Sequence, residues 1–370
     1  MEPAPQRETY KYPTITAIGL MSGTSMDGVD AALIETDGQS IKRFGPVHHV
    51  VYDESFRCRL RAALGKKPDD GAEWSDISKD LTEKHIDVVL QLLSMNDIDA
   101  AKIDVIGFHG HTVWHQPEKH ETCQIGDGAL LSRKTGIPVV NDLRSADVAA
   151  GGQGAPLAPL YHCALAQDFG KPLAVLNIGG VANVTWIGTD ETVLAFDTGP
   201  GNGLIDDWVL QTIKRPMDEG GALARSGTVN AIILVQLLSH PYFDQVPPKS
   251  LDRLDFSYEP VRGLTPEDGA ATLTAFTAEA IRKSVAHLPE PPAQWLVCGG
   301  GRHNKTLMDL LRKGLHVTVE PVEAVSWSGD ALEAQAFGFL AARSLQGLPI
   351  TLPTTTGVLQ PMTGGVHHKP

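Results

Sequence analysis

The residues with the clearest chemical potential form a turn of glycine, hydroxyl and acidic side chains between positions 19 and 30. Its glycines let the backbone approach a ligand closely, and successive N–H groups of such a turn form an anion-binding concavity. The carboxylate of Asp27 could hold a hydrated cation. The turn therefore predicts phosphate binding with magnesium, and an ordinary polar hairpin is the alternative. The residues predicted to contact phosphate are Ser22, Gly23, Thr24, Ser25, Met26, Asp27, Gly28 and Val29.

Two further glycine turns each follow an apolar run typical of a buried strand. One is Gly179-Gly180 after residues 173–178, and the other is Gly299-Gly300-Gly301 after residues 295–298. Neither has the spacing of a P-loop or of a dinucleotide-binding fingerprint. Tight turns alone would explain any single glycine cluster. Three together favour several loops that converge on one polyphosphate.

The elements that must position these turns repeat along the chain. Residues 15–21 and 28–35 predict a β-hairpin around the first turn, and residues 173–178 and 181–187 predict a second around Gly179-Gly180. A third strand, 192–196, leads into the Asp197 turn. Helices are predicted over residues 265–288, 304–312 and 330–344, with strands at 103–107, 295–298 and 316–319. A strand–turn–strand unit that recurs after half the chain indicates two duplicated α/β halves.

Length and composition set broad limits on the protein class. A chain of 370 residues favours two domains, and a net charge of −13 argues against nucleic acid or an anionic membrane as a partner. The four cysteines are scattered, which fits a reducing compartment better than disulfides or zinc. No apolar run approaches the roughly 20 residues that span a bilayer. These features predict a soluble cytoplasmic protein.

Five segments in the same order resemble the anhydro-N-acetylmuramic acid kinase family. The most specific are Ala-Ala-Gly-Gly-Gln-Gly-Ala-Pro-Leu at 149–157 and Asp-Thr-Gly-Pro-Gly-Asn at 197–202. The likeness runs from residue 15 to about residue 357. The segments that carry it are 20–30, 147–157, 177–180, 196–202 and 298–301.

The resemblance implies an α/β fold of two duplicated actin-like (ribonuclease H-like) domains that clasp ATP in a cleft. The first domain would cover residues 1–142, with 346–370 packing back on it, and the second residues 143–345. The implied reaction is ATP-dependent phosphorylation of 1,6-anhydro-N-acetylmuramic acid with opening of the anhydro ring by water, in peptidoglycan recycling. ATP, Mg²⁺ and the anhydro sugar are the implied ligands, and a homodimer is the implied assembly.

The reaction needs a base to activate water, and Asp197 matches the position of the family's catalytic aspartate. It precedes a Gly-Pro-Gly turn and would project into the cleft, unless it only caps its own turn. Asp27 would bind magnesium, and the glycines of the second and third turns would complete the ATP site. They are Gly179, Gly180, Gly299, Gly300 and Gly301.

The sugar is expected to meet polar residues from three parts of the chain. Arg144 could bind the lactyl carboxylate through two hydrogen bonds, although a solvated arginine is the alternative. Glu333 resembles a sugar-contacting acid, with an exposed helical glutamate as the alternative. The predicted sugar contacts are His109, Arg144, Asp147, Gly152, Gln153 and Glu333.

Several positions depart from the family pattern or invite another interpretation. His111 replaces the usual glutamine, and Arg302 follows the triple glycine, where the loop is expected to pack near adenine. Residues 249–253 match only half of a family block and receive no catalytic weight. His109, His111 and His115 could suggest zinc, but the family pattern favours a sugar contact. The terminal pair, 367–368, is expected to be a solvated tail.

Two other functions of the same fold are compatible with these sequence features. A sugar-independent ATPase or regulator would hydrolyse ATP alone, and it would not need the block at 149–157. An ordinary sugar kinase would phosphorylate a free hydroxyl, with no activation of water by Asp197. Both kinases need a base in the cleft, so an aspartate cannot separate them.

Overall fold

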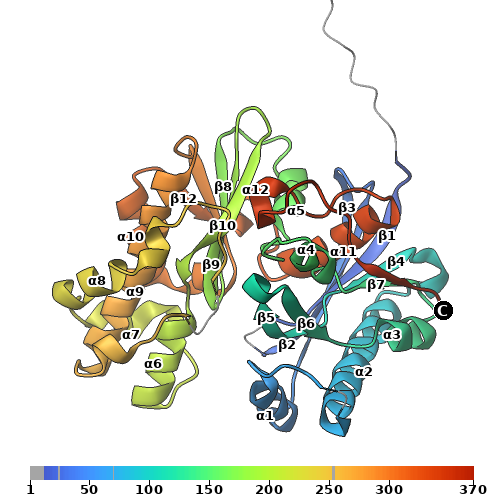
Figure 1. Cartoon of the computed structure of the whole chain (residues 1–370), viewed down its shortest axis with the longest axis horizontal. Coiled ribbons are helices and arrows are strands. Elements are labelled where there is room, and N and C mark those ends of the chain that lie inside the picture. Colours follow the sequence, from blue (N-terminus) through green and yellow to red (C-terminus); the bar gives the residue numbers. More distant parts are fainter. Residues whose placement is uncertain (1–11, 24–25, 70, 252–254) are drawn as a thin grey trace, which may run out of the picture.

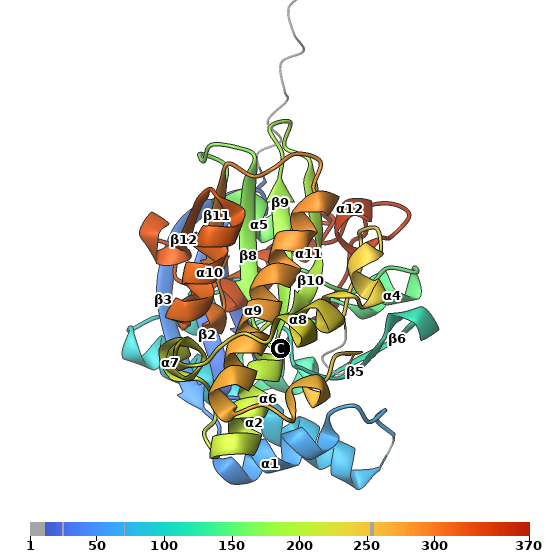
Figure 2. The same ribbon diagram turned by 90° about the vertical axis from the view of Figure 1, so that its left-hand side faces the viewer.

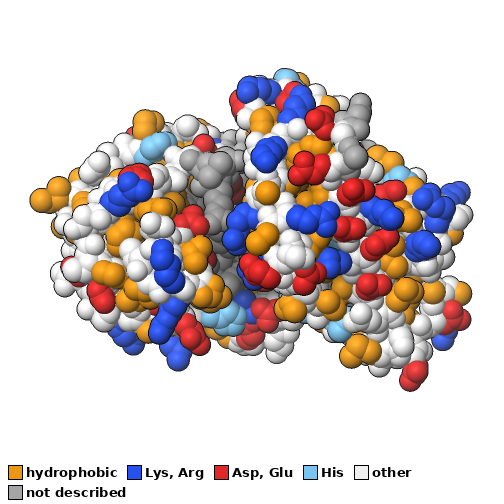
Figure 3. Space-filling view, turned by 90° about the horizontal axis from the view of Figure 1, so that it is seen from below, with side chains coloured by type: hydrophobic (Ala, Val, Ile, Leu, Met, Phe, Trp, Pro, Cys, Tyr) orange, Lys and Arg blue, Asp and Glu red, His pale blue; other side chains and the backbone are white. Residues whose placement is uncertain are grey.

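The chain folds into two lobes, each built on one mixed β-sheet with helices against it (Figure 1). The computed structural model describes residues 12–370, except for 24–25, 70 and 252–254. Thr24 and Ser25 of the first turn, and Asp252 and Arg253, therefore lie outside the described residues. The surface is hollowed between the lobes when the molecule is seen from below (Figure 3).

The sheet of the first lobe has the strand order β13-β7-β4-β1-β2-β3. Strand β2 pairs antiparallel with both β1 and β3, whereas β4 pairs parallel with β1 and with β7. The terminal strand β13 joins the edge antiparallel to β7. The strands are β1 (Ile15–Met21), β2 (Gly28–Thr36), β3 (Ile41–Val51), β4 (Val105–Phe108), β7 (Val139–Asn141) and β13 (Val366–His368).

The sheet of the second lobe repeats this pattern, with the order β10-β9-β8-β11-β12. Here β9 pairs antiparallel with β8 and β10, and β11 pairs parallel with β8 and β12. The five shared strands have the same order and directions in both lobes, which confirms the predicted duplication. The strands are β8 (Leu173–Ile178), β9 (Val181–Ile187), β10 (Val193–Pro200), β11 (Gln294–Cys298) and β12 (Thr318–Pro321).

Helices cover both sheets, and a short hairpin extends from the first lobe. The hairpin strands are β5 (His111–Gln116) and β6 (Glu121–Ile125). In the second lobe, α9 and α10 pack on one face of the sheet (Figure 2). The helices are α1 (Glu54–Ala63), α2 (Ala72–Met95), α3 (Gly128–Thr135), α4 (Ser145–Ala149), α5 (Pro159–Leu165), α6 (Gly203–Ile213), α7 (Ala222–Ser226), α8 (Ala231–Leu238), α9 (Pro266–Ser284), α10 (Lys305–Leu315), α11 (Leu332–Leu345) and α12 (Pro353–Thr356).

Local capping explains where helices α9 and α10 of the second lobe begin. Thr265 precedes α9, and its hydroxyl accepts the N–H of Asp268 at 3.1 Å. Asn304 does the same for α10, accepting the N–H of Leu307 at 3.0 Å. Each cap satisfies one of the N–H groups that a helix leaves unpaired at its start. The predicted start near residue 265 is confirmed, although the helix proper ends at Ser284.

Helix α11 lies against the first sheet, not the second. A Cβ atom on Gly19 of β1 would stand 1.7 Å from the Ala334 carbonyl oxygen, and one on Gly107 of β4 would stand 2.0 Å from that of Phe337. Only glycine permits this approach of helix to strand. The C-terminal part of the chain that packs on the first lobe therefore includes α11 and begins before residue 346, where the prediction had placed its start. The other domain boundaries stay predictions.

The C-terminal segment does pack back on the first lobe. His368 of β13 is hydrogen-bonded to the Asn141 side chain at 2.9 Å, and His367 contacts the Ser344 hydroxyl at 2.8 Å. The expectation of a solvated tail at 367–368 was wrong, because strand pairing to β7 and these side-chain bonds hold it. Among the described residues, no helix is both long and apolar enough to cross a membrane.

Candidate functional site

Asp197 lies inside strand β10, at a break in its pairing with β9. The register between the two strands shifts between Asp197 and Gly199, and such a bulge redirects side chains. The Asp197 side chain is only 6% exposed, and its Oδ2 accepts the N–H of Leu251 at 2.8 Å. Burial raises its pKa to about 7, against the opposing effects of the Leu251 N–H and the Arg144 charge. A carboxylate that titrates near neutrality can accept a proton.

A short segment crosses behind Asp197, and we call residues 249–251 the strap. Its Lys249 carbonyl accepts the Asp197 N–H at 3.0 Å. The Lys249 ammonium donates to the Tyr242 carbonyl at 2.9 Å and lies over the Tyr242 ring, while the Tyr242 hydroxyl donates to the Asp197 carbonyl at 2.6 Å. Burial lowers the pKa of Lys249 to about 8. Sequence reasoning gave this segment no weight, yet the structure places it against the candidate base.

Arg144 is held by His109 and by the loop after α4. Its Nε and Nη2 donate to His109 Nε2 at 3.2 and 3.0 Å, and Nη1 donates to the Gly154 carbonyl at 2.5 Å. His109 Nδ1 contacts the Gly110 carbonyl at 3.0 Å, so the imidazole is the neutral Nδ1–H form. Burial and the Arg144 charge lower the pKa of His109 well below its usual value. Both ring nitrogens thus serve to position Arg144.

Asp147 organises the loop that carries the predicted sugar contacts. Its Oδ1 accepts the Gly154 N–H and its Oδ2 the Thr356 hydroxyl, both at 2.6 Å. The Gly152 N–H donates to the Asp147 carbonyl at 2.9 Å, and the Gln153 N–H to the Thr356 carbonyl at 2.6 Å. A Cβ on Gly152 would stand 2.2 Å from Asp147 Oδ1. The carboxylate is therefore occupied by the protein, and its contact with sugar stays a prediction.

The first glycine turn rests on a buried chain of polar side chains. Tyr52 donates its hydroxyl to Ser22 Oγ at 2.7 Å, and Ser22 Oγ lies 3.0 Å from His111 Nδ1. Because Tyr52 donates, the Ser22 proton is available to His111. Burial lowers the pKa of His111 to about 4, so this residue supports the turn as a neutral ring. Asp27 is exposed beside the turn, and its carbonyl accepts the Tyr52 N–H at 3.0 Å.

The second and third glycine turns meet at the ends of two neighbouring parallel strands, β8 and β11. The Gly179 carbonyl accepts the Asn202 N–H at 2.7 Å, and this folds the second turn onto the turn after Asp197. Gly299 has a φ of 73°, and a Cβ there would stand 2.3 Å from Asn177 Oδ1. Glycine is thus required by both conformation and space. These contacts bring the second and third turns together, and the convergence of all three turns on one polyphosphate stays a prediction.

Glu333, just inside the start of α11, lies where the glycine turns of both lobes approach one another. Its Oε1 accepts the Asn177 amide at 3.2 Å. Enclosure by the surrounding protein raises its pKa, and the negative charges of Asp30 and Asp27 add to that rise. The side chain is still open to solvent, which is expected of a group inside a cleft.

The carboxylates near the first turn suit magnesium more than zinc. Mg²⁺ prefers oxygen ligands and commonly takes one or two carboxylates together with water and phosphate oxygens. Asp27 offers such oxygens, whereas Asp30 Oδ1 lies 2.7 Å from His49 Nδ1, and both aspartate charges raise the pKa of Glu333. Within the described ranges, no three His, Cys, Asp or Glu side chains are grouped to hold a metal by themselves.

Arg302, which follows the third glycine turn, points into the protein. Its guanidinium pairs with Glu323 at 2.8 Å and Asp330 at 2.6 Å, and it donates to the Gly299 carbonyl at 2.9 Å. The Glu323 and Asp330 side chains are both substantially exposed, so these are not fully buried ion pairs. They hold Arg302 against the third glycine turn. Proximity of this loop to adenine stays a prediction.

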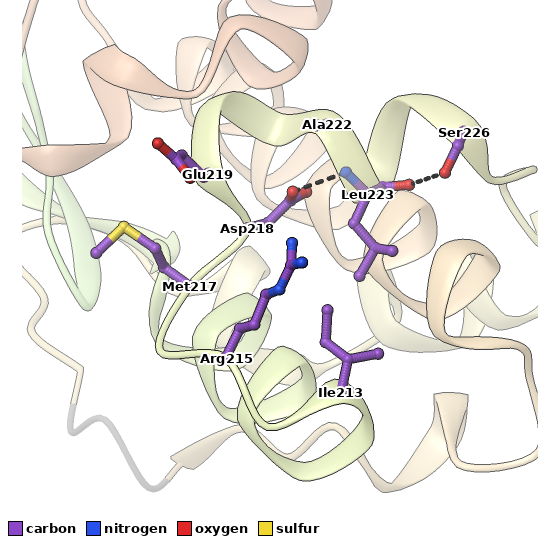
Figure 4. Close-up of a pocket in the computed structure, with 8 residues that line it drawn as sticks. All are labelled: Ile213, Arg215, Met217, Asp218, Glu219, Ala222, Leu223 and Ser226. Carbon is purple, nitrogen blue, oxygen red and sulfur yellow. Dashed lines mark hydrogen bonds between the residues drawn. The ribbon is translucent and has the colours of Figure 1, made fainter.

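A pocket of about 340 Å³ lies next to the same loop (Figure 4). Gly221 lies in the sequence between two lining residues, Glu219 and Ala222, and its carbonyl accepts the Thr306 hydroxyl at 2.6 Å. A Cβ on Gly221 would stand 2.0 Å from Asn304 Oδ1. Asp218 caps α7 by accepting two N–H groups. None of the predicted site residues lines this pocket. The lining residues are Ile213, Arg215, Met217, Asp218, Glu219, Ala222, Leu223 and Ser226.

Comparison with known proteins places the chain among well-defined relatives. Residues 15–369 match the family model described as anhydro-N-acetylmuramic acid kinase. A protein of that name from Rhodospirillum rubrum is 57% identical over 355 residues, covering 95% of this chain and 94% of the relative. One from Paramagnetospirillum magneticum is 56% identical over 357 residues, covering 96% and 99%.

Solved structures give a more distant likeness. The chain resembles component A of the (R)-2-hydroxyglutaryl-CoA dehydratase of Acidaminococcus fermentans, with 12% identity and a TM-score of 0.46. That likeness covers 89% of this chain and 99% of the solved one. At this TM-score it adds nothing to the sequence match.

Proposed function

Because the chain belongs to the anhydro-N-acetylmuramic acid kinase family, we propose that Asp197 is the general base of the reaction of that family. The family phosphorylates 1,6-anhydro-N-acetylmuramic acid with ATP and opens the anhydro ring with water. The products are N-acetylmuramic acid 6-phosphate and ADP, in the recycling of peptidoglycan. The observation that carries the proposal is the buried Asp197 carboxylate, whose pKa is raised to about 7.

The reaction balances with one water and one proton acceptor. The oxygen of water forms a bond to the anomeric carbon while the bond from that carbon to O6 breaks. O6 forms a bond to the γ-phosphorus, and the bond from phosphorus to the ADP oxygen breaks. Asp197 takes the proton that water loses. Because the pKa of Asp197 is about 7, near pH 7 about half of the protein molecules carry Asp197 in the ionised form that can accept a proton.

Arg144 is proposed to bind the lactyl carboxylate of the sugar. A guanidinium pairs with a carboxylate through two parallel hydrogen bonds when its plane is fixed. His109 and the Gly154 carbonyl fix that plane from one side. Gly152, Gln153 and Glu333 are proposed as further sugar contacts, with His109 acting through Arg144.

The three glycine turns are proposed to hold the phosphates of ATP, with Mg²⁺ at Asp27. The backbone N–H groups of residues 22–29 would bind phosphate oxygens, and the turns at 179–180 and 299–301 would close around the rest of the nucleotide. When bound, Mg²⁺ neutralises charge on the transferring phosphoryl group. Asp27 supplies the carboxylate, and Asp30 lies on the same hairpin.

We also propose a cytoplasmic enzyme that acts as a homodimer. The net charge of −13 supports a partner other than nucleic acid or an anionic membrane, since no basic excess offsets phosphate repulsion. Size-exclusion chromatography with light scattering tests the dimer directly. A single species of about twice the chain mass of 39.7 kDa is expected.

The function is tested by ADP release under three conditions, together with the mass of the sugar product. Magnesium-ATP is supplied alone, with 1,6-anhydro-N-acetylmuramic acid, or with N-acetylmuramic acid. Release only with the anhydro sugar, and a product heavier by phosphate and water, is the expected result. Equal release without sugar would instead indicate an ATPase, and efficient turnover of N-acetylmuramic acid would indicate an ordinary sugar kinase.

A further inference from the structure

The strap, residues 249–251, contacts Asp197 on two sides. The Lys249 carbonyl accepts the Asp197 N–H at 3.0 Å, and the Leu251 N–H donates to Asp197 Oδ2 at 2.8 Å. Among the described residues, no donor reaches Asp197 Oδ1, so the strap selects which oxygen can take a proton. A shift of the strap by a fraction of an ångström would alter both the direction and the basicity of this carboxylate.

The strap is fixed at one end and connected to the sugar loop at its middle. Lys249 is 7% exposed and is anchored between the Tyr242 carbonyl and ring. Ser250 Oγ donates to Gln153 Oε1 at 2.7 Å, across 97 residues of sequence. Gln153 belongs to the loop that Asp147 organises, and its own N–H is bonded to the Thr356 carbonyl.

We propose that Ser250 is a positioning residue that couples the sugar-binding loop to Asp197 through its hydrogen bond to Gln153. With Oε1 facing Ser250, the planar amide of Gln153 directs its two N–H donors away from the strap, where a sugar oxygen can accept them. A bound sugar would then hold Gln153, Gln153 would hold Ser250, and the strap would hold Asp197. The coupling favours a correctly oriented base when the anhydro sugar is present.

The inference rests on the proposed role of Asp197 as base. Burial and the Asp197 charge raise the pKa of Tyr242, whose hydroxyl donates to the Asp197 carbonyl. The groups that act on the Asp197 charge are the Leu251 N–H and the Arg144 guanidinium. Of these, only the Leu251 N–H belongs to the strap. Loosening the strap removes a hydrogen bond to the ionised form, and the pKa of Asp197 must rise.

The test compares Ser250→Ala with Ser250→Thr and with a matched control, Ser239→Ala. Ser239 is exposed at the end of α8, and its hydroxyl donates to the Gln236 carbonyl, one turn away. For Ser250→Ala we expect kcat to fall roughly three- to tenfold, the effect of one hydrogen bond on a barrier. The KM for ATP should stay within about twofold, and the acid limb of kcat/KM should move to higher pH. Ser250→Thr should restore both, and Ser239→Ala should change neither.

Gln153→Ala removes the same hydrogen bond from the other side and keeps the test decisive if Ser250→Ala folds poorly. The same upward movement of the acid limb is expected, and adding Ser250→Ala to it should produce no further movement. An acid limb that stays in place in both single variants would overturn the inference, as would fully additive effects. A lower kcat without that movement would indicate a merely structural serine.

One further variant separates this inference from the proposed function. If Asp197→Asn retains turnover, the base assignment fails and the coupling argument fails with it. If Asp197→Asn is inactive while Ser250→Ala has the control's pH profile, the base assignment stands and only the coupling is wrong.

Discussion

Replacing Asp197 with asparagine should make the folded protein more stable at neutral pH. Burial raises the pKa of Asp197 to about 7 from its ordinary value of 3.8, so folding works against the ionised form. An amide has a similar shape and carries no charge, and its oxygen can still accept the Leu251 N–H that Asp197 accepts at 2.8 Å. Asparagine therefore keeps the hydrogen bond and avoids the cost of a buried charge.

The sign and size follow from proton linkage. Between pH 4 and pH 7 the folded state binds the Asp197 proton and the unfolded state has lost it, so wild-type stability falls as pH rises. The pKa values of Asp197 in the folded and unfolded states differ by roughly three, and a difference of one corresponds to about 1.36 kcal/mol. The wild type should thus lose about 4 kcal/mol relative to Asp197→Asn between pH 4 and pH 8, and little more above that.

Urea unfolding of both proteins without ligands, at pH 3, 4, 5, 6, 7 and 8, measures this difference. Asp190→Asn is the control of opposite sign, because hydrogen bonds from Thr192 lower the pKa of that exposed carboxyl. Its wild-type carboxylate contributes stability that is lost as the pH falls below about 4. A stability gap between wild type and Asp197→Asn that stays constant from pH 4 to pH 8 would refute the reasoning.

Three other substitutions test separate parts of the site. His109→Ala should raise the KM for the sugar roughly tenfold and leave that for ATP unchanged in steady-state assays, because Arg144 loses its acceptor. Arg302→Ala removes two ion pairs beside the third glycine turn, and should raise the KM for ATP several-fold and cost roughly 1–3 kcal/mol in urea unfolding. Gly19→Ala should cost about 3 kcal/mol or more, since its Cβ would meet a backbone oxygen at 1.7 Å, whereas Gly170→Ala, with open space, should be neutral in the same experiment.

Much of the fold was predictable because its signals are local. Alternating apolar residues around a glycine turn predicted both hairpins, and the Thr265-Pro266 pair marked the start of a long helix at the observed position. The packing of α11 on the first sheet was not predicted. Its signal is the pair Gly19 and Gly107, which leave room for a helix, but glycines within strands do not identify the helix that approaches them.

The sequence drew attention to side chains of the candidate site, whose roles stay predictions, and it missed the backbone contacts around them. The residue types of Asp197, Arg144 and Asp147 drew attention to them, and the structure shows each of them hydrogen-bonded to a neighbouring loop. The strap received no weight because it matches only half of a family block, and its contacts with Asp197 use a carbonyl of Lys249 and an N–H of Leu251, groups that nearly every residue possesses. Sequence patterns report side-chain chemistry, so a contact made by the main chain leaves no mark in them.

Turnover of Asp197→Asn, measured beside its affinity for ATP, tests the central claim most directly. A general base contributes at least about 100-fold to a rate, and the substitution leaves the glycine turns untouched. We expect kcat with the anhydro sugar to fall by at least that factor, with ATP bound as tightly as in the wild type. Turnover above about a tenth of the wild-type rate would contradict the account.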